Sequence, residues 1–209
     1  MGSGQKQRVV AVVSGKGGTG KTTTAILLAC AAAEHGDTST VVDVDPQADA
    51  SSLGWATEAD AAGDPLPERD TVVGVVARDL GRRLPALTAG AARVWLDTAP
   101  GDGGGIEAAI AAADLALVPC QPTVMDVRRA ARIVGHAVEV GVPALVVLTR
   151  TTIRTHAADN AREALTDAGI AVAEATVPER QAVAQAYGLR PRPSAVAPFQ
   201  VLYDEIKEL

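Results

Sequence analysis

The sequence contains few aromatic residues, few cysteines and no long apolar run. Only 2% of its 209 residues are aromatic, so the core must be built from Ala, Val, Leu and Ile. No apolar stretch approaches the roughly 20 residues that a transmembrane helix needs. The first residues lack the apolar segment behind a basic start that marks a secretory signal. The two cysteines, Cys30 and Cys120, show no C-x-x-C spacing and cannot form a disulfide framework, which suits a reducing compartment.

Basic charge is also scarce. The formal net charge is −6, from 19 basic and 25 acidic side chains, which is not the overall charge of a dedicated nucleic-acid-binding protein. Residues 1–119 hold 9 basic and 15 acidic side chains and residues 120–209 hold 10 of each, so a local arginine surface in the second part stays open. Lysine is rarer still, with four residues against 15 arginines, yet Lys16 and Lys21 lie in one short loop. A compact ammonium suits a crowded phosphate site better than the wide fork of arginine.

Strand-like and helix-like segments alternate along the chain. We expect strands at 8–13, 40–43, 93–97, 115–118, 144–149 and 170–175, and helices at 21–35, 71–84, 123–140, 155–168, 179–187 and 196–209. The segment 46–70 is polar and predicts irregular surface structure, and the glycine-rich loop at 98–105 is either a switch loop or a flexible turn. The alternation predicts right-handed βαβ crossovers and an α/β fold with a mostly parallel, twisted sheet covered by helices on both faces. We expect one domain over residues 8–209, preceded by a disordered N-terminus or tag remnant at residues 1–7.

The loop that joins the first strand to the first helix carries a phosphate-binding motif. Residues 15–22 read G-K-G-G-T-G-K-T, which fits G-x-x-x-x-G-K-[ST] between a strand and a helix, as in P-loop NTPases. Glycines let successive backbone N–H groups and the positive helix end point at phosphate oxygens. Lys21 is expected to bridge the β- and γ-phosphates and the Thr22 hydroxyl to bind Mg²⁺. The other expected nucleotide contacts here are Gly17, Gly18, Thr19, Gly20 and, at the α-phosphate, Thr23.

Lys16 is a second lysine in the same loop. One nucleotide does not need two ammonium groups from within a single loop, so Lys16 is free to serve an oxygen on the far side, including that of a nucleotide bound by another copy of the chain. The alternative is a solvated lysine at the loop entry.

Three carboxylates follow strands. Asp43 and Asp45 lie two apart at the end of one predicted strand, and Asp97 ends another. Because the carboxyl ends of parallel strands meet at one edge, these side chains are expected beside the phosphate loop. Mg²⁺ keeps several waters and prefers one or two nearby carboxylates, so Asp97 is expected to hold a magnesium-bound water. Asp43 or Asp45 is alternatively a cap of the following turn.

These motifs together resemble the ParA/MinD superfamily of deviant Walker A ATPases, most closely the small ParA proteins of the ParF type. The family signature K-G-G-x-G-K-[ST] matches residues 16–22, and its D-x-D-P-Q motif matches residues 43–47. Its Walker B strand, which ends in Asp and Thr-x-Pro, matches residues 94–100, and a later Val-Pro strand matches residues 117–119. The resemblance extends from about residue 8 to residue 209.

The resemblance implies roles for several residues. Lys16 would reach across an ATP sandwich dimer as a catalytic residue together with Lys21, Asp45 would orient the attacking water, and Asp43 would support the metal shell. The chain would be a slow, Mg²⁺-dependent ATPase that converts ATP to ADP and phosphate. The residues that would flank the adenine are Thr149, Arg150, Pro178 and Arg180.

The resemblance also implies partners. The expected partners are a second copy on ATP, a ParB-like or other centromere- or cargo-binding adaptor, and non-specific DNA, in a cytoplasmic, nucleoid-associated protein that drives plasmid or chromosome partition or cargo positioning. The acidic tail at 203–209 does not favour membrane binding. The alternative function is that of a MinD-like or other deviant Walker A ATPase, which positions a protein cargo without DNA. Candidate DNA contacts, or else parts of solvated helix faces, are Arg150, Arg154, Arg162, Arg180, Arg190 and Arg192.

Overall fold

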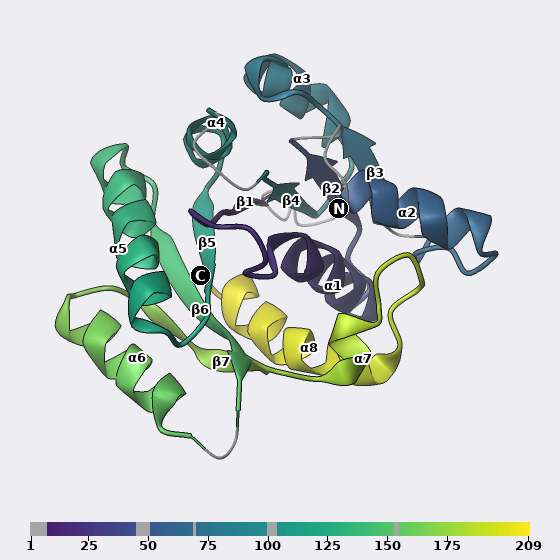
Figure 1. Ribbon diagram of the computed structural model, residues 1–209. Coiled ribbons are helices and arrows are strands. Elements are labelled where there is room, and N and C mark those ends of the chain that lie inside the picture. Colours follow the sequence, from purple (N-terminus) through teal and green to yellow (C-terminus); the bar gives the residue numbers. More distant parts are fainter. Residues whose placement is uncertain (1–7, 45–50, 69, 100–103, 153–154) are drawn as a thin grey trace.

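In the part of the chain that the structure describes, seven parallel strands form one twisted sheet in the order β3-β2-β4-β1-β5-β6-β7 (Figure 1). The structure is a computed structural model that describes residues 8–44, 51–68, 70–99, 104–152 and 155–209. The short β-branched and aliphatic runs of the sequence form these strands because a parallel sheet buries both of its faces. The strands are β1 (Arg8–Val12), β2 (Ser39–Asp43), β3 (Asp70–Gly74), β4 (Arg93–Asp97), β5 (Leu115–Cys120), β6 (Ala144–Thr151) and β7 (Val172–Pro178).

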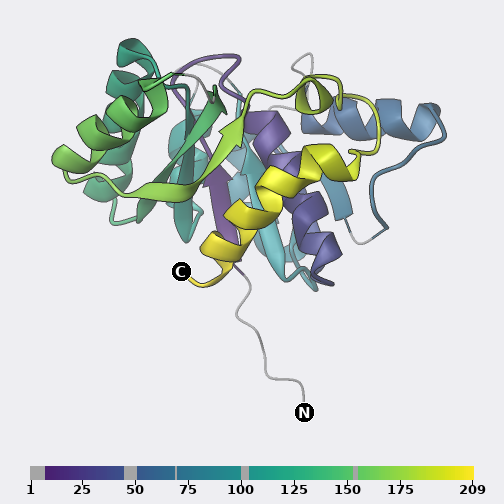
Figure 2. The same cartoon turned by 90° about the horizontal axis from the view of Figure 1, so that it is seen from below.

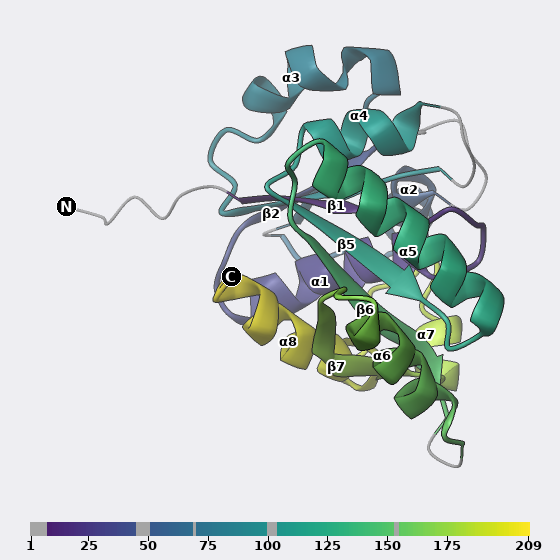
Figure 3. The same ribbon diagram turned by 90° about the vertical axis from the view of Figure 1, so that its left-hand side faces the viewer.

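Helices cover both faces of the sheet, which confirms the expected α/β fold (Figures 2 and 3). One face is covered by α1, which packs against α8, and the other by α4, α5 and α6. The alanine-rich α1 lies against the centre of the sheet with almost all of its side chains buried. The helices are α1 (Lys21–Glu34), α2 (Ser52–Ala61), η1 (Ala77–Asp79), α3 (Leu80–Leu87), α4 (Gly105–Ala111), α5 (Val124–Glu139), α6 (Ala157–Asp167), α7 (Gln181–Ala184) and α8 (Pro193–Lys207).

Two apolar clusters, one on each face of the sheet, make up the core. The first joins α1, α2 and α8 to the sheet and contains the buried aromatic residues Trp55, Trp95, Phe199 and Tyr203. The second joins the sheet to α3, α4, α5 and α6 and is built from Ala, Val, Leu and Ile with Cys120. The prediction of a mainly aliphatic core therefore holds for the second face, whereas the few aromatic residues gather on the first.

The region before β4 differs from the sequence prediction. The helix expected at 71–84 is wrong in its first half: Asp70–Gly74 form strand β3, because the β-branched run at 71–73 extends the sheet beside β2. Helical structure begins only at η1 and α3. The segment expected to be irregular contains helix α2, which Ser51 caps by accepting a hydrogen bond from the Gly54 backbone N–H at 3.2 Å.

Several other helix and strand boundaries differ from those predicted from the sequence. The helix expected at 179–187 contracts to α7, and the strand expected at 170–175 is β7, which ends at Pro178. The C-terminal helix begins earlier than expected, at Pro193, because proline is well suited to the first turn of a helix. Helix α4, which follows the glycine-rich loop, was not foreseen.

The parallel arrangement brings the carboxyl ends of all the strands to one edge. β1 lies at the centre of the sheet, between β4 and β5. From β1 the strand order extends to β4, β2 and β3 on one side and to β5, β6 and β7 on the other, so the loop after β1 lies at the point where the strand order reverses. Open α/β sheets bind ligands at such a point.

Candidate nucleotide-binding site

The loop between β1 and α1 has the backbone that a phosphate cradle requires. Gly18 and Gly20 have φ angles of 75° and 95°, a region that favours glycine, and Gly20 is the N-cap of α1. The loop is held from outside at two places. Gln121 Nε2 donates to the Gly18 carbonyl oxygen at 3.0 Å, and Thr149 Oγ1 donates to the Thr19 carbonyl oxygen at 3.2 Å. The N-terminus of α1, which is the positive end of the helix dipole, is therefore preceded by a glycine-rich loop that hydrogen bonds hold in place.

Lys21 lies inside this loop rather than in solvent. Its side chain is 6% exposed, and Nζ donates to Ser14 Oγ at 3.2 Å and to the Lys16 carbonyl oxygen at 3.1 Å. Burial lowers the pKa of Lys21, and the nearby charge of Asp97 opposes that effect. The two oxygens that Lys21 contacts are neutral, so a phosphate oxygen is a stronger acceptor for this ammonium than its present partners.

Lys16 points to a different place. Its ammonium lies 3.5 Å from Asp126 Oδ1 of helix α5 and its side chain is 45% exposed. Asp126 is 5% exposed and also binds Thr123 Oγ1 at 2.8 Å and Arg129 Nη1 at 3.0 Å. These hydrogen bonds and the Lys16 charge hold the pKa of Asp126 below its usual range although burial opposes them. The two lysines of the loop therefore have separate environments, one buried and one at the surface.

Asp97 ends β4 beside the loop, and only one of its two carboxylate oxygens accepts a hydrogen bond from the described residues. Its Oδ2 accepts a hydrogen bond from Ser52 Oγ at 2.5 Å. Oδ1 is buried and has no hydrogen-bond partner among the residues that the structure describes. Burial raises the pKa of Asp97 to about 6, and the hydroxyl groups of Ser52 and Thr22 oppose this rise. A buried, unpaired carboxylate oxygen beside a threonine hydroxyl fits the carboxylate and hydroxyl ligands that Mg²⁺ takes next to bound phosphates.

Asp43 lies next to Asp97 on the neighbouring strand. The two are register partners in the β2–β4 ladder, and Asp43 Oδ2 accepts a hydrogen bond from the Leu53 backbone N–H at 3.0 Å. Asp43 therefore contacts the start of helix α2, which agrees with the alternative that it caps the following turn. It also lies beside Asp97, the residue expected to hold the magnesium-bound water. Asp45, the expected water-orienting residue, lies outside the described residues. Within the described ranges, no group of three His, Cys, Asp or Glu side chains forms a metal cage.

The four residues expected at the base line one cavity with the loop. This base cavity has a volume of about 310 Å³ and brings Thr149, Arg150, Pro178 and Arg180 together with Thr19, Gly20 and Thr23. Arg150 has a φ angle of 51°, a rare conformation for a residue other than glycine, and it lies at the end of β6 where the cavity opens. The structure thus places the expected base contacts beside the phosphate loop.

Three aromatic residues of the base cavity were missed by the sequence interpretation. Trp55, Tyr187 and Phe199 come from α2, from the segment after α7 and from α8. They are three of the five aromatic residues in the whole chain. That scarcity was the available signal, because aromatic side chains in an aliphatic protein suggest a flat ligand, but no spacing in the sequence joins them.

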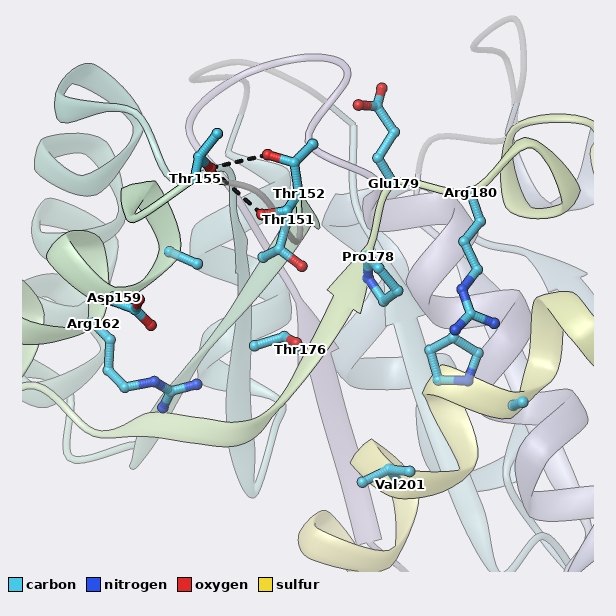
Figure 4. A pocket seen from close by; sticks show the side chains of 13 residues that line it. Thr151, Thr152, Thr155, Asp159, Arg162, Thr176, Pro178, Glu179, Arg180 and Val201 are labelled. Carbon is cyan, nitrogen blue, oxygen red and sulfur yellow. Dashed lines mark hydrogen bonds between the residues drawn. The ribbon is translucent and has the colours of Figure 1, made fainter.

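A second, open cavity lies between α6, β7 and α8 (Figure 4). It has a volume of about 1050 Å³ and shares Pro178, Glu179 and Arg180 with the base cavity. In Figure 4, Arg162 lies along β7, where its guanidinium donates to the Ala173 and Glu174 carbonyl oxygens at 2.7 and 3.3 Å. Arg162 is therefore committed to the backbone and is a poorer candidate for DNA than the exposed arginines.

The other candidate arginines are mostly at the surface. Arg150, Arg180, Arg190 and Arg192 are exposed, and Arg192 lies 3.5 Å from Asp64. Arg154 lies outside the described residues. Within the described chain, none of the helices has the length and apolar character required to span a membrane.

Comparisons with known proteins agree with this geometry. Residues 10–190 match the family described as the CobQ/CobB/MinD/ParA nucleotide binding domain. The chain is 36% identical over 175 residues to Maintenance of carboxysome distribution protein A of Gloeobacter kilaueensis, covering 81% of this chain and 76% of that protein. It is 30% identical over 183 residues to Protein ParA of Rhizobium radiobacter, covering 83% and 79%.

The fold likeness extends to solved structures. The septum site-determining protein MinD of Pyrococcus horikoshii, solved in complex with Mg-ADP, has a TM-score of 0.76 at 20% identity, covering 96% of each chain. The match of sequence over most of the chain and the P-loop beside a Walker B carboxylate lead to one conclusion: the chain belongs to the CobQ/CobB/MinD/ParA nucleotide-binding family, in the ParA/MinD group of P-loop ATPases.

Proposed function

We propose that residues 8–209 form a single ParA-type ATPase domain that binds ATP and ADP with Mg²⁺ and dimerises around ATP. The dimer binds DNA without sequence preference in the cytoplasm, and an adaptor that carries the cargo stimulates slow hydrolysis. The observation that carries this proposal is the arrangement along one edge of the sheet, where Lys21, Asp97 and the base cavity follow one another. Relatives named for carboxysome distribution and as ParA support a role in partition or positioning.

The phosphate loop supports nucleotide binding and phosphoryl transfer. Lys21 exchanges the Ser14 hydroxyl and the Lys16 carbonyl for oxygens of the β- and γ-phosphates, and the backbone of residues 17–20 surrounds the phosphates. Thr23 lines the path from the loop to the base cavity, which suits a contact to the α-phosphate. Phosphoryl transfer depends mainly on such positioning and charge neutralisation.

The carboxylates support a metal-assisted reaction. Thr22 and Asp97 would hold Mg²⁺, directly or through water, and Asp43 supports the same shell from the neighbouring strand. When bound, Mg²⁺ would neutralise charge on the phosphates and help to fix their geometry. Asp45, which follows these strands in the D-x-D-P-Q motif, is proposed to orient the attacking water.

The surface position of Lys16 supports the dimer. A lysine that only stabilised its own loop would gain most from burial, whereas this one is half exposed and held by a single ion pair to Asp126. The Lys16 ammonium is open to solvent, and Asp126 has further hydrogen bonds from Thr123 and Arg129, so Lys16 can exchange this ion pair for a triphosphate oxygen of a second copy. Lys16 and Lys21 thus supply charge to one nucleotide from the two subunits.

The DNA partner is proposed from exposed arginines beside the base cavity. The exposed arginines Arg150 and Arg180 line the base cavity, and phosphate contacts by such residues are blind to sequence. Arg190 is exposed at a separate cavity, which it lines together with Glu34. The alternative is a MinD-like ATPase that positions a protein cargo without DNA. One relative is named for maintenance of carboxysome distribution, which supports a protein cargo as the alternative.

The test compares Lys16→Ala with Lys21→Ala and with the control Lys207→Ala, which removes a lysine paired with Asp204 far from the loop. We expect Lys16→Ala to bind ADP as the wild type does but to lose ATP-dependent dimers in size exclusion with light scattering. Lys21→Ala should lose nucleotide binding in calorimetry and phosphate release. Unchanged dimerisation of Lys16→Ala would refute the role across the dimer, and a wild type that binds no adenine nucleotide would refute the whole proposal.

A further inference from the structure

Helix α2 begins on the two carboxylates of the metal-site candidate. The first residue of the helix, Ser52, is fully buried, and its hydroxyl donates to Asp97 Oδ2 at 2.5 Å. The next residue, Leu53, donates its backbone N–H to Asp43 Oδ2 at 3.0 Å. A helix N-terminus carries partial positive charge, and the first turn of α2 presents this charge to both carboxylates. Neither the sequence motifs nor the proposed function assigns a role to this helix.

One turn later the same helix forms a wall of the base cavity. Trp55 is 1% exposed and lines the cavity together with Tyr187, at a distance of 5.3 Å between ring centroids. Its indole Nε1 donates to the Leu189 carbonyl oxygen at 2.8 Å. Trp55 is thus fixed at both its ring face and its polar end to the segment that closes the cavity after α7.

Two glycines allow this close contact. A Cβ at Gly54 would lie 2.8 Å from the Tyr187 hydroxyl oxygen, and one at Gly188 would lie 2.5 Å from Glu58 Oε2. Gly188 also has a φ angle of 72°, which favours glycine. The helix and the segment 187–189 therefore meet on both sides of Trp55, with a hydrogen bond and a ring contact between them. A displacement of α2 must displace this wall of the base cavity as well.

We propose that α2 couples the metal end of the nucleotide site to the base end. Ser52 is a positioning residue that holds Asp97 Oδ2 and leaves Oδ1 for Mg²⁺. Trp55 lines the base cavity, so a change in the position of α2 changes the shape of that cavity. This inference rests on the proposed function, because it requires that the cavity binds a nucleotide. It assigns to the chain a link between the two ends that is separate from the phosphate loop.

The physical basis is that the first turn of one helix contacts both the metal-site carboxylates, through Ser52 and Leu53, and the wall of the base cavity, through Trp55. Mg²⁺ that binds near Asp97 changes the charge that Ser52 and the helix N-terminus face, and so changes the preferred position of α2. Coupling between two sites is reciprocal in free energy, so Mg²⁺ raises nucleotide affinity by the same factor as the nucleotide raises Mg²⁺ affinity. A hydrogen bond to a charged group contributes enough that its loss changes an equilibrium by roughly tenfold.

The first experiment measures ADP affinity by calorimetry, with Mg²⁺ and with EDTA, for the wild type, Ser52→Ala and Thr57→Ala. Thr57 lies on α2, and its exposed hydroxyl donates to the Leu53 carbonyl oxygen, so it is a matched control for the helix itself. We expect Ser52→Ala to lose roughly tenfold of the Mg²⁺-dependent gain in affinity while its affinity in EDTA stays within about twofold of the wild type. Thr57→Ala should keep the full gain. The same gain in Ser52→Ala as in the wild type would overturn the role of Ser52.

The second experiment measures the fluorescence of Trp55 on α2, and it does not require Ser52→Ala to fold. Mg²⁺ added to the ADP complex should change the tryptophan emission of the wild type and of Trp95→Phe, in which Trp55 is the remaining tryptophan. Trp55→Phe should not show this change. An emission of Trp55 that responds to ADP but not to Mg²⁺ would refute the coupling. A wild type that binds no ADP would instead refute the proposed function.

Discussion

The carboxylate of Asp70 makes the stability of this protein dependent on pH. Asp70 begins β3 at the edge of the sheet, and both of its carboxylate oxygens are buried without a hydrogen-bond partner among the described residues. Burial raises the pKa of Asp70 to about 7, and the positive charge of Arg190 opposes this rise. The folded protein therefore binds a proton at Asp70 at pH values where the unfolded chain has released it.

The sign and size of the effect follow from that difference. The folded state holds the proton more tightly than the unfolded chain does. The contribution of Asp70 to the free energy of unfolding is therefore most favourable below a pH of about 4 and is lost as the pH rises to about 7. Each unit of pKa difference corresponds to about 1.4 kcal/mol, so the wild type loses roughly 2 to 3 kcal/mol between about pH 5 and pH 8 from this one group. Asp70→Asn has the same shape and does not titrate, so it should not show this loss.

The assay is urea unfolding of both proteins at several pH values. We expect Asp70→Asn to gain stability relative to the wild type as the pH rises from about 5 to 8, by roughly 2 to 3 kcal/mol. The control is Asp60→Asn, which removes an exposed carboxylate at the end of α2. A difference between wild type and Asp70→Asn that stays constant over this range would show that the carboxyl is not held in a buried, protonated form.

Two further predictions concern the edge strand and DNA. Glu205 accepts hydrogen bonds from the Glu174 and Ala175 backbone N–H groups at 2.9 and 3.1 Å, where β7 bulges from its pairing with β6. Glu205→Gln should cost about 1 to 2 kcal/mol in urea unfolding and the exposed Glu208→Gln under about 0.5, and equal costs would contradict this role. If the exposed arginines bind DNA, an ATP-dependent mobility shift should weaken between low and moderate salt, whereas its absence at low salt would favour the MinD-like alternative.

Part of the fold could be predicted because the signals were local. The strand–loop–helix motif at residues 15–22 and the strand that ends in Asp97 depend on neighbours in sequence, and the structure has β1, α1 and β4 there. Strand β3 was missed because a three-residue β-branched run, read without its neighbour β2, is compatible with a helix as well as with a strand. Helix α2 was missed because its sequence gives no periodic apolar face and lies within the polar segment 46–70.

The sequence by itself determined the chemistry of the phosphate end, because a phosphate is bound by backbone amides and one lysine that lie within a few residues of each other. Only the tertiary structure decided what surrounds that end. Ser52 meets Asp97, Lys16 meets Asp126, and Trp55 meets Tyr187 across separations of up to 132 residues. Such contacts depend on which strand ends and helices the sheet brings to one edge, and the order of strands in a sheet is set by long-range packing that no local pattern encodes.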